Sequence, residues 1–305
     1  MTLDETTIER LAFNKYLVNV ASEQVNEPQP MAAAAVLTLH DAVELFLQHA
    51  AEHLDAESAG NSDFTFMEYW EVISDQLPAD ERLGQKPAMR RLNDARGTLK
   101  HSGTRPDPSD IASFDVTVRD FFEENVNKVF GVRFDSISMV YLVDYESTRD
   151  ILQEVEDLLK EDRNNDAVQK LAIAYDDLFF EYNQRMRDEF GYKPFSIDST
   201  RGFSPSKRDM RRNYGREMER FFERVNETID GVEKAIRVLS LGMDFRRYSR
   251  FDSLTPTVLR TMDGGYEAPE IPDDTEITDE DAEFCFDFVV ETAINLQKRD
   301  ISVEE

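Results

Sequence analysis

The sequence has almost none of the residues that form covalent cross-links. It contains one cysteine, Cys285, so no disulfide can form within the chain. Cys285 lies in the apolar run 284–290, which is typical of a buried thiol with a structural role. Apolar stretches are also short. None approaches the roughly 20 residues that cross a bilayer, and the acidic first residues lack the layout of a signal peptide. These absences predict a cytoplasmic protein without a membrane span.

Residues that bind metals are scarce as well, since the chain has four histidines. His49 and His53 have a spacing that can hold a metal between helix turns, but the sequence indicates no third ligand. His40 lies on an apolar helix face one turn before Glu44, which indicates a hydrogen-bonded core histidine. The alternative is that it lines the same cleft as Arg96. Glycine-rich phosphate loops, Ser-His-Asp order and CxxC pairs are lacking. We expect no metal and no cofactor.

Basic residues are also few relative to acidic ones. The chain has 35 Lys and Arg against 63 Asp and Glu, which gives a formal net charge of −28. The hydrophobic content of 40% and the 21 phenylalanines exclude global disorder, so this charge lies on a folded surface. An acid-rich surface whose cations are mostly arginine is typical of a high-salt cytoplasm, where ions screen like charges. The composition therefore predicts a halophilic source.

Apolar residues recur at helical spacing along nearly the whole chain, and strand-like alternation is almost absent. Clear stripes are Ile111, Phe114, Val118, Phe121 and Phe122, and Met218, Phe222, Val225, Ile229, Val232, Ile236 and Leu239. We predict an all-α protein. Its expected parts are an N-terminal helix and linker (1–30), a helical bundle (31–135), and an acidic helical domain (136–305) with loops near 191–206 and 263–278.

Helix boundaries are indicated by proline, glycine and capping residues. Pro87 is suited to the first helical position, where its missing N–H would be unpaired anyway. Gly103 is suited to end that helix in a left-handed conformation. Ser109 or Asp110 is expected to cap the following helix. Thr278, with an acidic residue three positions later, resembles a capping box for the last helix.

One segment reverses the charge of the chain. Residues 86–105 contain one acid, Asp94, and six basic residues: Lys86, Arg90, Arg91, Arg96, Lys100 and Arg105. Because the rest of the surface repels polyanions, this segment is where one would bind. Arg96 and His101 lie within it. Five helical positions rotate a side chain by about 140° and raise it by about 7.5 Å, so these two do not share a face. A second copy of the helix packed alongside would let both reach one phosphate.

Residues 91–109, RLNDARGTLKHSGTRPDPS, resemble the motif region of the HEPN superfamily, whose hallmark is Arg-x4–6-His near a helix end. The upstream pieces HDAVELFLQHAAEH and FTFMEYWEVI fit the same pattern, and the similarity covers roughly residues 30–135. Many members of that superfamily are metal-independent ribonucleases of microbial defence and toxin systems, and they act as dimers with the motifs facing each other. The resemblance therefore implies a HEPN-like bundle, an RNA partner and a homodimer formed through this bundle.

Carried over by position, the resemblance gives Arg96 the role of stabilising the charge on the scissile phosphate. It gives His101 the role of moving a proton at the ribose 2′-oxygen or the leaving 5′-oxygen, which leaves a cyclic phosphate. Gly97 stands where the family often has a polar residue, and Asn93 or Ser102 would supply that hydrogen bond.

The remaining basic residues of the segment give the expected phosphate contacts. Lys100 is expected to bind phosphate, with Arg91 and Arg105 beside it. Two alternatives remain for the pair Arg96 and His101: a catalytically inactive module that binds a nucleotide, an RNA or a protein partner, or a purely structural role. In the structural role Arg96 would pair with a core carboxylate.

A second basic cluster spans residues 201–220, and Arg246, Arg247 and Arg250 would extend it. Tyr192, Phe195 and Phe203 flank the cluster in sequence. One interpretation is a groove for an RNA backbone in which these aromatics stack on bases. The other, which we favour, is a surface whose cations pair with the surplus of acidic helices.

Overall fold

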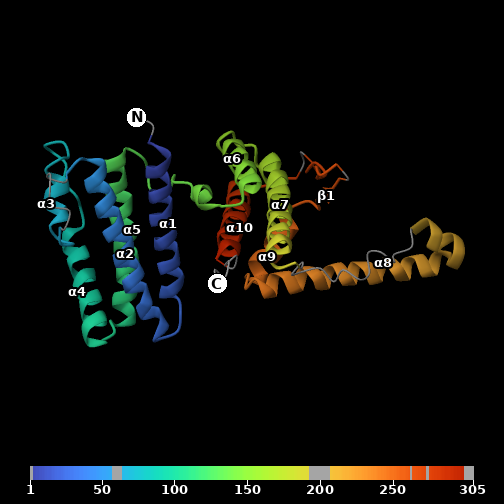
Figure 1. Ribbon diagram of the computed structural model, residues 1–305, viewed down its shortest axis with the longest axis horizontal. Helices are drawn as coiled ribbons and strands as arrows, with labels where there is room; N and C mark the ends of the chain where they lie inside the picture. Colours follow the sequence, from blue (N-terminus) through green and yellow to red (C-terminus); the bar gives the residue numbers. More distant parts are fainter. Residues whose placement is uncertain (1–2, 57–63, 192–206, 262, 273–274, 299–305) are drawn as a thin grey trace. The chain divides into compact units, whose positions relative to one another are not determined.

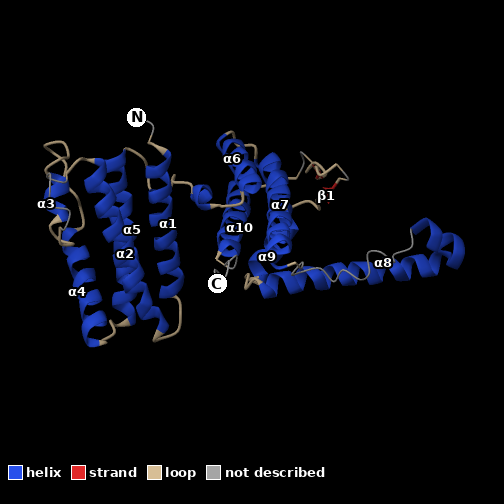
Figure 2. Cartoon of the chain, viewed as in Figure 1, coloured by secondary structure: helices blue, strands red, loops and turns tan. Residues whose placement is uncertain are grey.

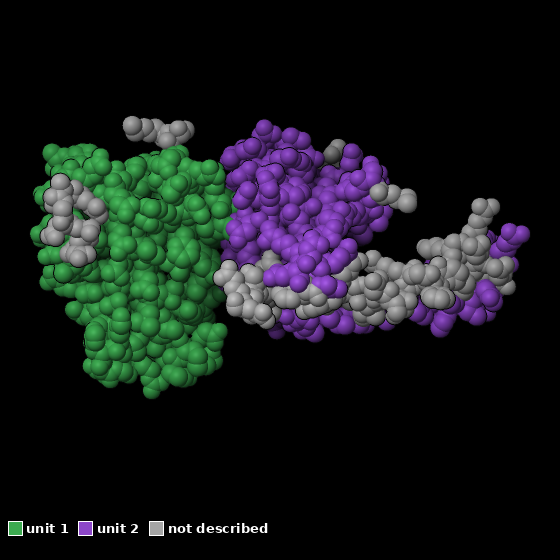
Figure 3. Space-filling view, viewed as in Figure 1, with its two compact units in different colours: residues 1–142 green, residues 143–305 purple. Residues whose placement is uncertain are grey.

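The computed structural model describes residues 3–56, 64–191, 207–261, 263–272 and 275–298. Its regular structure is helical apart from one antiparallel pair of two-residue strands, which confirms the predicted all-α class (Figure 2). The chain divides into two compact units, residues 1–142 and 143–305 (Figure 3). The division falls where the sequence turns into a plain series of acidic amphipathic helices.

The first unit is a bundle of four long helices with short helices at its connections (Figure 1). The long helices are α1 (Glu5–Val25), α2 (Ala35–His53), α4 (Lys86–Ser102) and α5 (Pro108–Phe130). The short ones are α3 (Tyr69–Ser74) and the 3-10 helices η1 (Met31–Ala34) and η2 (Met139–Leu142). Residues 5–25 therefore belong to this unit, where α1 packs on α2 and α5.

Helix α2 lies at the centre of the bundle and contacts α1, α3, α4 and α5. Its Phe46 packs edge-on against Phe121 and Phe122 of α5, with ring centroids 5.3 and 5.4 Å apart. The predicted stripe of α5 is buried throughout, because its spacing keeps every member on the face toward α2. The segment Met31–His53 is long and apolar enough to cross a membrane by length and composition alone, and 56% of its 18-residue apolar window is buried inside the unit, a property that core helices share.

The residues at the two ends of α4 explain where the helix begins and ends. Gln85 caps its start in a left-handed conformation and Pro87 lies in the first turn. Gly103, with φ of +66°, ends the helix and donates its N–H to the Leu99 carbonyl at 3.1 Å. The predicted cap of α5 was wrong. Its N-cap is Asp107, two or three residues earlier than expected, because Pro108 occupies the first helical position, which favours proline.

The second unit is built on α6 (Glu146–Lys160), α7 (Asn164–Phe190) and α10 (Asp279–Gln297), which pack on one another. Helix α9 (Phe245–Leu254) packs on α10, and the strands β1 (Leu259–Arg260) and β2 (Tyr266–Glu267) form the hairpin. Thr278 Oγ1 accepts the N–H of Asp281 at 3.2 Å, which confirms the predicted cap of α10. Cys285 is buried, and burial raises the pKa of its thiol to about 12, as expected of a structural cysteine.

The apolar stripe of helix α8 (Lys207–Ser240) stays mostly outside the described cores. Val238 is buried near its end, where α8 meets α9, but Met218, Val232, Ile236 and Leu239 are 40–71% exposed. The helix is broken at Gly215, whose φ of +86° and ψ of 171° are not helical. The sequence predicted that this helix is amphipathic. In the structure, no described element packs on its apolar face along most of the helix.

Candidate functional site

The basic segment of the first unit forms α4 and the turn that follows it. Lys86 pairs with Glu71 at 3.1 Å. The other five cations make no ion pair or side-chain hydrogen bond with any residue that the structure describes: Arg90, Arg91, Arg96, Lys100 and Arg105. The single acid of α4, Asp94, is exposed and pairs with none of them.

Some other cations of the first unit do pair with acids. Arg10 pairs with Glu52 at 2.5 Å, and Lys128 pairs with Glu124 at 2.6 Å, both within the first unit. With almost two carboxylates for every cation, pairing is the expected state of a surface arginine here. Helix α4 therefore presents uncompensated positive charge, which attracts anions, whereas the acidic remainder of the chain repels them.

Arg96 is half-buried on α4 between Leu92, which is fully buried, and Leu99, which packs against the core. Burial is the main cause that lowers the pKa of His40 on α2, and the nearby charge of Arg96 lowers it further. The structural alternative, in which a core carboxylate neutralises Arg96, is absent among the described residues. A half-buried guanidinium without a partner has donors free for an anion.

His101 lies in the last turn of α4 and is exposed, next to Lys100 and Ser102, which are also exposed. Because α4 is continuous from Lys86 to Ser102, Arg96 and His101 differ by about 140° around the helix axis. One chain therefore does not place the two side chains on a common face.

Asn93 has a partner that sequence reasoning did not assign to it. Its Oδ1 lies 3.0 Å from His40 Nε2, which joins α4 to α2. The His40 side chain is 1% exposed and stacks on Phe66, with ring centroids 4.3 Å apart. The prediction of a hydrogen-bonded core histidine is confirmed, and His40 also lies near Arg96.

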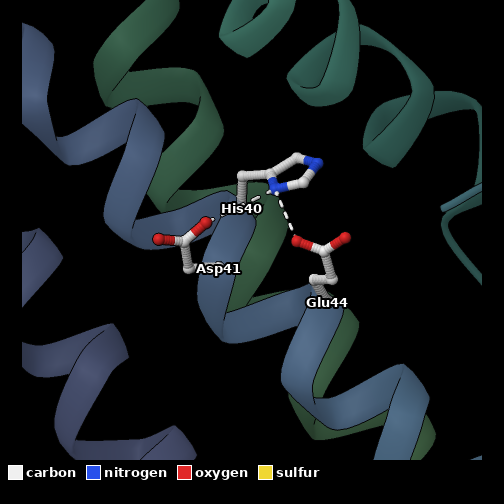
Figure 4. A group of neighbouring side chains, drawn as sticks. All are labelled: His40, Asp41 and Glu44. Atoms are coloured by element: carbon white, nitrogen blue, oxygen red, sulfur yellow. Dashed lines mark ion pairs between the residues drawn. The ribbon is translucent and has the colours of Figure 1, made fainter.

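The second ring nitrogen of His40 has different surroundings. Figure 4 shows Nδ1 facing the carboxylates of Asp41 and Glu44, while Nε2 points away from both. The distances from Nδ1 are 3.7 Å to Asp41 Oδ1 and 3.7 Å to Glu44 Oε2, so Nδ1 makes no hydrogen bond. The sequence analysis identified Glu44, four residues after His40, as its neighbour. It missed the proximity of the Asp41 carboxylate, because the side chains of adjacent helical residues usually diverge.

His49 and His53 do not form a metal-binding group with a third residue among those described. The pKa of His49 is lowered by burial and by Arg10, and His53 lies against Phe130 with ring centroids 4.7 Å apart. His49 is partly buried on α2, and His53 is exposed and contacts Phe130 alone among the described aromatic rings.

The second basic cluster is only partly described. Arg201 and the aromatics Tyr192, Phe195 and Phe203 lie outside the described residues. Among the side chains that can be described, Arg212, Arg216 and Arg220 are exposed, and Arg211 lies 3.9 Å from Glu219. Arg247 pairs with Glu291 and Arg250 with Asp281, so these two cations are already neutralised. Arg212, Arg216 and Arg220 make no ion pair with a described residue, so the described contacts support the paired interpretation for Arg211, Arg247 and Arg250 alone.

A buried polar cluster in the second unit was not expected from the sequence. Asp177 of α7 is 4% exposed and accepts hydrogen bonds from Thr148 of α6 at 3.0 Å and from Tyr266 of β2 at 2.7 Å. Burial and the nearby Asp177 raise the pKa of Glu181, which also contacts Thr148. Each partner comes from a different element, so the cluster holds the hairpin and α6 onto α7.

Comparisons with family models, with curated proteins and with solved structures found no match to this chain. The arguments about its function therefore come from its own residues and from the resemblance of its Arg-x4-His segment.

Proposed function

We propose that this protein is a metal-independent endoribonuclease of the HEPN type that binds RNA along α4 and acts as a dimer in microbial defence or toxin-type RNA cleavage. The observation that carries the proposal is the unpaired row of cations on α4 in a chain of net charge −28. The resemblance of residues 91–109 to the HEPN motif supports the choice of reaction.

Binding follows from electrostatics. An RNA backbone carries one negative charge per nucleotide, so it is repelled by the acidic surface and held where cations are free. Arg91, Lys100 and Arg105 are exposed and can each contact one phosphate. Arg96 is less accessible, and its planar guanidinium can bind two oxygens of a single phosphate. The last turn of α4 would thus position the phosphate that is cut.

Cleavage requires one base and one stabilised anion. The ribose 2′-oxygen loses its proton to an imidazole and attacks phosphorus, the bond from phosphorus to the 5′-oxygen breaks, and the leaving 5′-oxygen takes up a proton from water. The products are a 2′,3′-cyclic phosphate and a 5′-hydroxyl. His101 suits the proton transfer because imidazole titrates near neutral pH. Arg96 suits stabilisation of the charge that grows on the phosphoryl oxygens.

The dimer follows from the helix geometry. Arg96 and His101 of one chain diverge by about 140°, so a phosphate held by one arginine is reached by the histidine of a second α4. In this arrangement each site uses Arg96 from one copy and His101 from the other. Mixing inactive Arg96→Ala chains with inactive His101→Ala chains is then expected to restore part of the activity, because one mixed site is complete.

The test is cleavage of a labelled RNA in EDTA at several KCl concentrations, with wild type, Arg96→Ala, His101→Ala and the control Arg133→Ala. Arg133 is an exposed arginine of the same unit, ion-paired with Asp135. We expect His101→Ala to lower the cleavage rate by about 100-fold or more while RNA binding persists. Arg96→Ala should lower both. Equal cleavage by wild type and His101→Ala, or loss of wild-type cleavage in EDTA, contradicts the proposal.

A second candidate is a binding module without catalysis. It is favoured by Gly97 in the place of the polar residue that often follows the arginine, and by the divergence of Arg96 and His101 within one chain. In the same assay this candidate predicts RNA binding that is lost with Arg96→Ala, no turnover by any variant, and no effect of His101→Ala.

A further inference from the structure

The imidazole of His40 is held in one orientation. On one side, Phe66 stacks on the ring at 4.3 Å. At one end, Nε2 lies 3.0 Å from Asn93 Oδ1, and because an amide oxygen only accepts, Nε2 carries the proton and donates it. The ring cannot rotate without losing both contacts. Its Nδ1 is therefore fixed toward the carboxylates of Asp41 and Glu44 (Figure 4).

This orientation is unfavourable without a cation. Because Nε2 already carries the proton that it donates to Asn93, Nδ1 of the neutral ring presents a lone pair. That lone pair faces two carboxylate oxygens at 3.7 Å, with no proton between them. Nδ1 is also buried without a hydrogen-bond partner. Three electron-rich atoms turned toward one another, one of them fixed by packing, are the arrangement of ligands around a metal ion.

We propose that His40 Nδ1 and the carboxylates of Asp41 and Glu44 bind one divalent first-row transition-metal ion, with Zn²⁺ as the best fit. One imidazole nitrogen and two carboxylates suit such an ion better than Mg²⁺ or Ca²⁺, which prefer oxygen alone. Three protein ligands leave a fourth position for water. The site is distinct from the RNA-binding row, and it departs from the expectation that the chain holds no metal.

The distances fit such an ion after a small movement. Donors bound at about 2.1 Å in tetrahedral geometry lie about 3.4 Å apart. The two distances of 3.7 Å therefore need to shorten by about 0.3 Å, and all three ligand atoms already lie within 4.8 Å of one another. The Asp41 and Glu44 side chains are 59% and 37% exposed, so they can move toward the ion, and the ion can enter from solvent.

The surrounding charges favour one ion of charge +2. The two carboxylates carry −2, and the nearby Arg96 reduces this without ion-pairing with either of them. The hydrogen bond between His40 Nε2 and Asn93 supplies the outer contact that ligating histidines usually make. A bound ion would fix His40 and, through Asn93, the turn of α4 that carries Arg96.

The test is equilibrium dialysis of untagged, EDTA-stripped full-length protein against micromolar Zn²⁺, Mn²⁺ or Mg²⁺. KCl at about 1 M screens the diffuse binding expected of so acidic a surface. Wild type is compared with Asp41→Asn/Glu44→Gln and with a charge-matched control, Asp120→Asn/Glu123→Gln, which alters two exposed acids of α5. His40→Gln is a third variant, and circular dichroism checks that it folds.

We expect one Zn²⁺ per chain in wild type and in the control, at least tenfold weaker Zn²⁺ binding in Asp41→Asn/Glu44→Gln, and no competition by Mg²⁺. Added Zn²⁺ should raise the melting temperature of wild type and not that of the Asp41→Asn/Glu44→Gln variant. Co²⁺ bound in place of Zn²⁺ should give visible absorption that the same variant lacks.

Two results would overturn the site. One is wild-type Zn²⁺ binding that is substoichiometric or equal to that of Asp41→Asn/Glu44→Gln. The other is a metal-free Asp41→Asn/Glu44→Gln protein that melts well below metal-free wild type. In that case the carboxylates stabilise the metal-free fold by accepting a hydrogen bond from a protonated Nδ1. Zn²⁺ binding is measured without RNA, so failure of the ribonuclease proposal leaves this result unaffected.

Discussion

At the scale of single residues, Gly97 is the position that local rules leave unexplained. It lies in the interior of α4, where glycine is less favourable than alanine by about 1 kcal/mol. A Cβ added at Gly97 would meet nothing within 4 Å, so no neighbouring side chain requires glycine there. We infer that an anion held by Arg96 also approaches the bare backbone at Gly97, the next residue along the helix.

This reasoning predicts opposite effects of Gly97→Ala on stability and on binding. The free energy of unfolding of the first unit should rise by about 0.5–1 kcal/mol, because alanine loses less backbone entropy in a helix. The affinity for RNA should fall, because the methyl group occupies the approach to Arg96. Urea unfolding and RNA titration measure the two effects.

Gly231→Ala on α8 is the matched control, since a Cβ there also meets nothing within 4 Å. It should leave RNA affinity unchanged. A Gly97→Ala protein that binds RNA as tightly as wild type would show that Gly97 has no part in binding.

At the scale of elements, hydrogen bonds between helices decide which faces meet. Asp177 of α7 joins α6 through Thr148 and the hairpin through Tyr266. His40 of α2 joins α4 through Asn93. Both contacts are buried or partly buried, and there a polar group without a hydrogen-bond partner lowers the stability by about 1–3 kcal/mol. Each hydrogen bond therefore restricts how its helices can rotate.

We therefore predict that Asp177→Ala lowers the free energy of unfolding of the second unit by about 2–3 kcal/mol, since two hydroxyl groups lose their acceptor. Thr148 keeps a longer contact with Glu181 at 3.3 Å, which limits the loss. Urea unfolding followed by circular dichroism measures the change. Asp188→Ala, an exposed acid on the same helix, should change stability by less than about 0.5 kcal/mol. Equal effects of the two substitutions would contradict the structural role of the cluster.

At the scale of the whole molecule, the net charge of −28 is the dominant property. Like charges on a compact surface repel one another, and salt shortens the range of that repulsion from about 10 Å at 0.1 M to about 3 Å at 1 M. Surface ion pairs contribute little against it, because exposed pairs are each worth about 0–1 kcal/mol. The proposal of a halophilic source depends on this balance.

Stability should accordingly rise with salt. Between 0.1 and 2 M KCl we expect the melting temperature to increase by at least about 5 °C, which corresponds to about 1–2 kcal/mol of relieved repulsion. The same titration near the sequence pI of about 4.5 should give a smaller increase, because the net charge is then close to zero. A melting temperature that does not change with KCl at neutral pH would exclude adaptation to high salt.

The sequence by itself determined the properties that depend on neighbours along the chain. Helical periodicity predicted the all-α class and the buried face of α5, and the backbone freedom of Gly103 predicted where α4 ends. The concentration of cations between Lys86 and Arg105 was visible in the same way. The sequence was insufficient where two local preferences compete. In α5, Ser109 and Asp110 are suited to cap the helix, but Pro108 takes the first helical position and Asp107 becomes the cap.

Only the tertiary structure decided which of these residues meet. His40 and Asn93 are 53 positions apart, and their hydrogen bond exists because α2 and α4 pack with those faces together. The same packing turns His40 Nδ1 toward two carboxylates and leaves Arg90, Arg91, Arg96 and Lys100 of α4 without an ion pair to any described residue. A contact between two helices depends on which helices pack together and on how each is rotated about its axis. Many small apolar contacts in the core fix both of these collectively, so no local sequence pattern contains them.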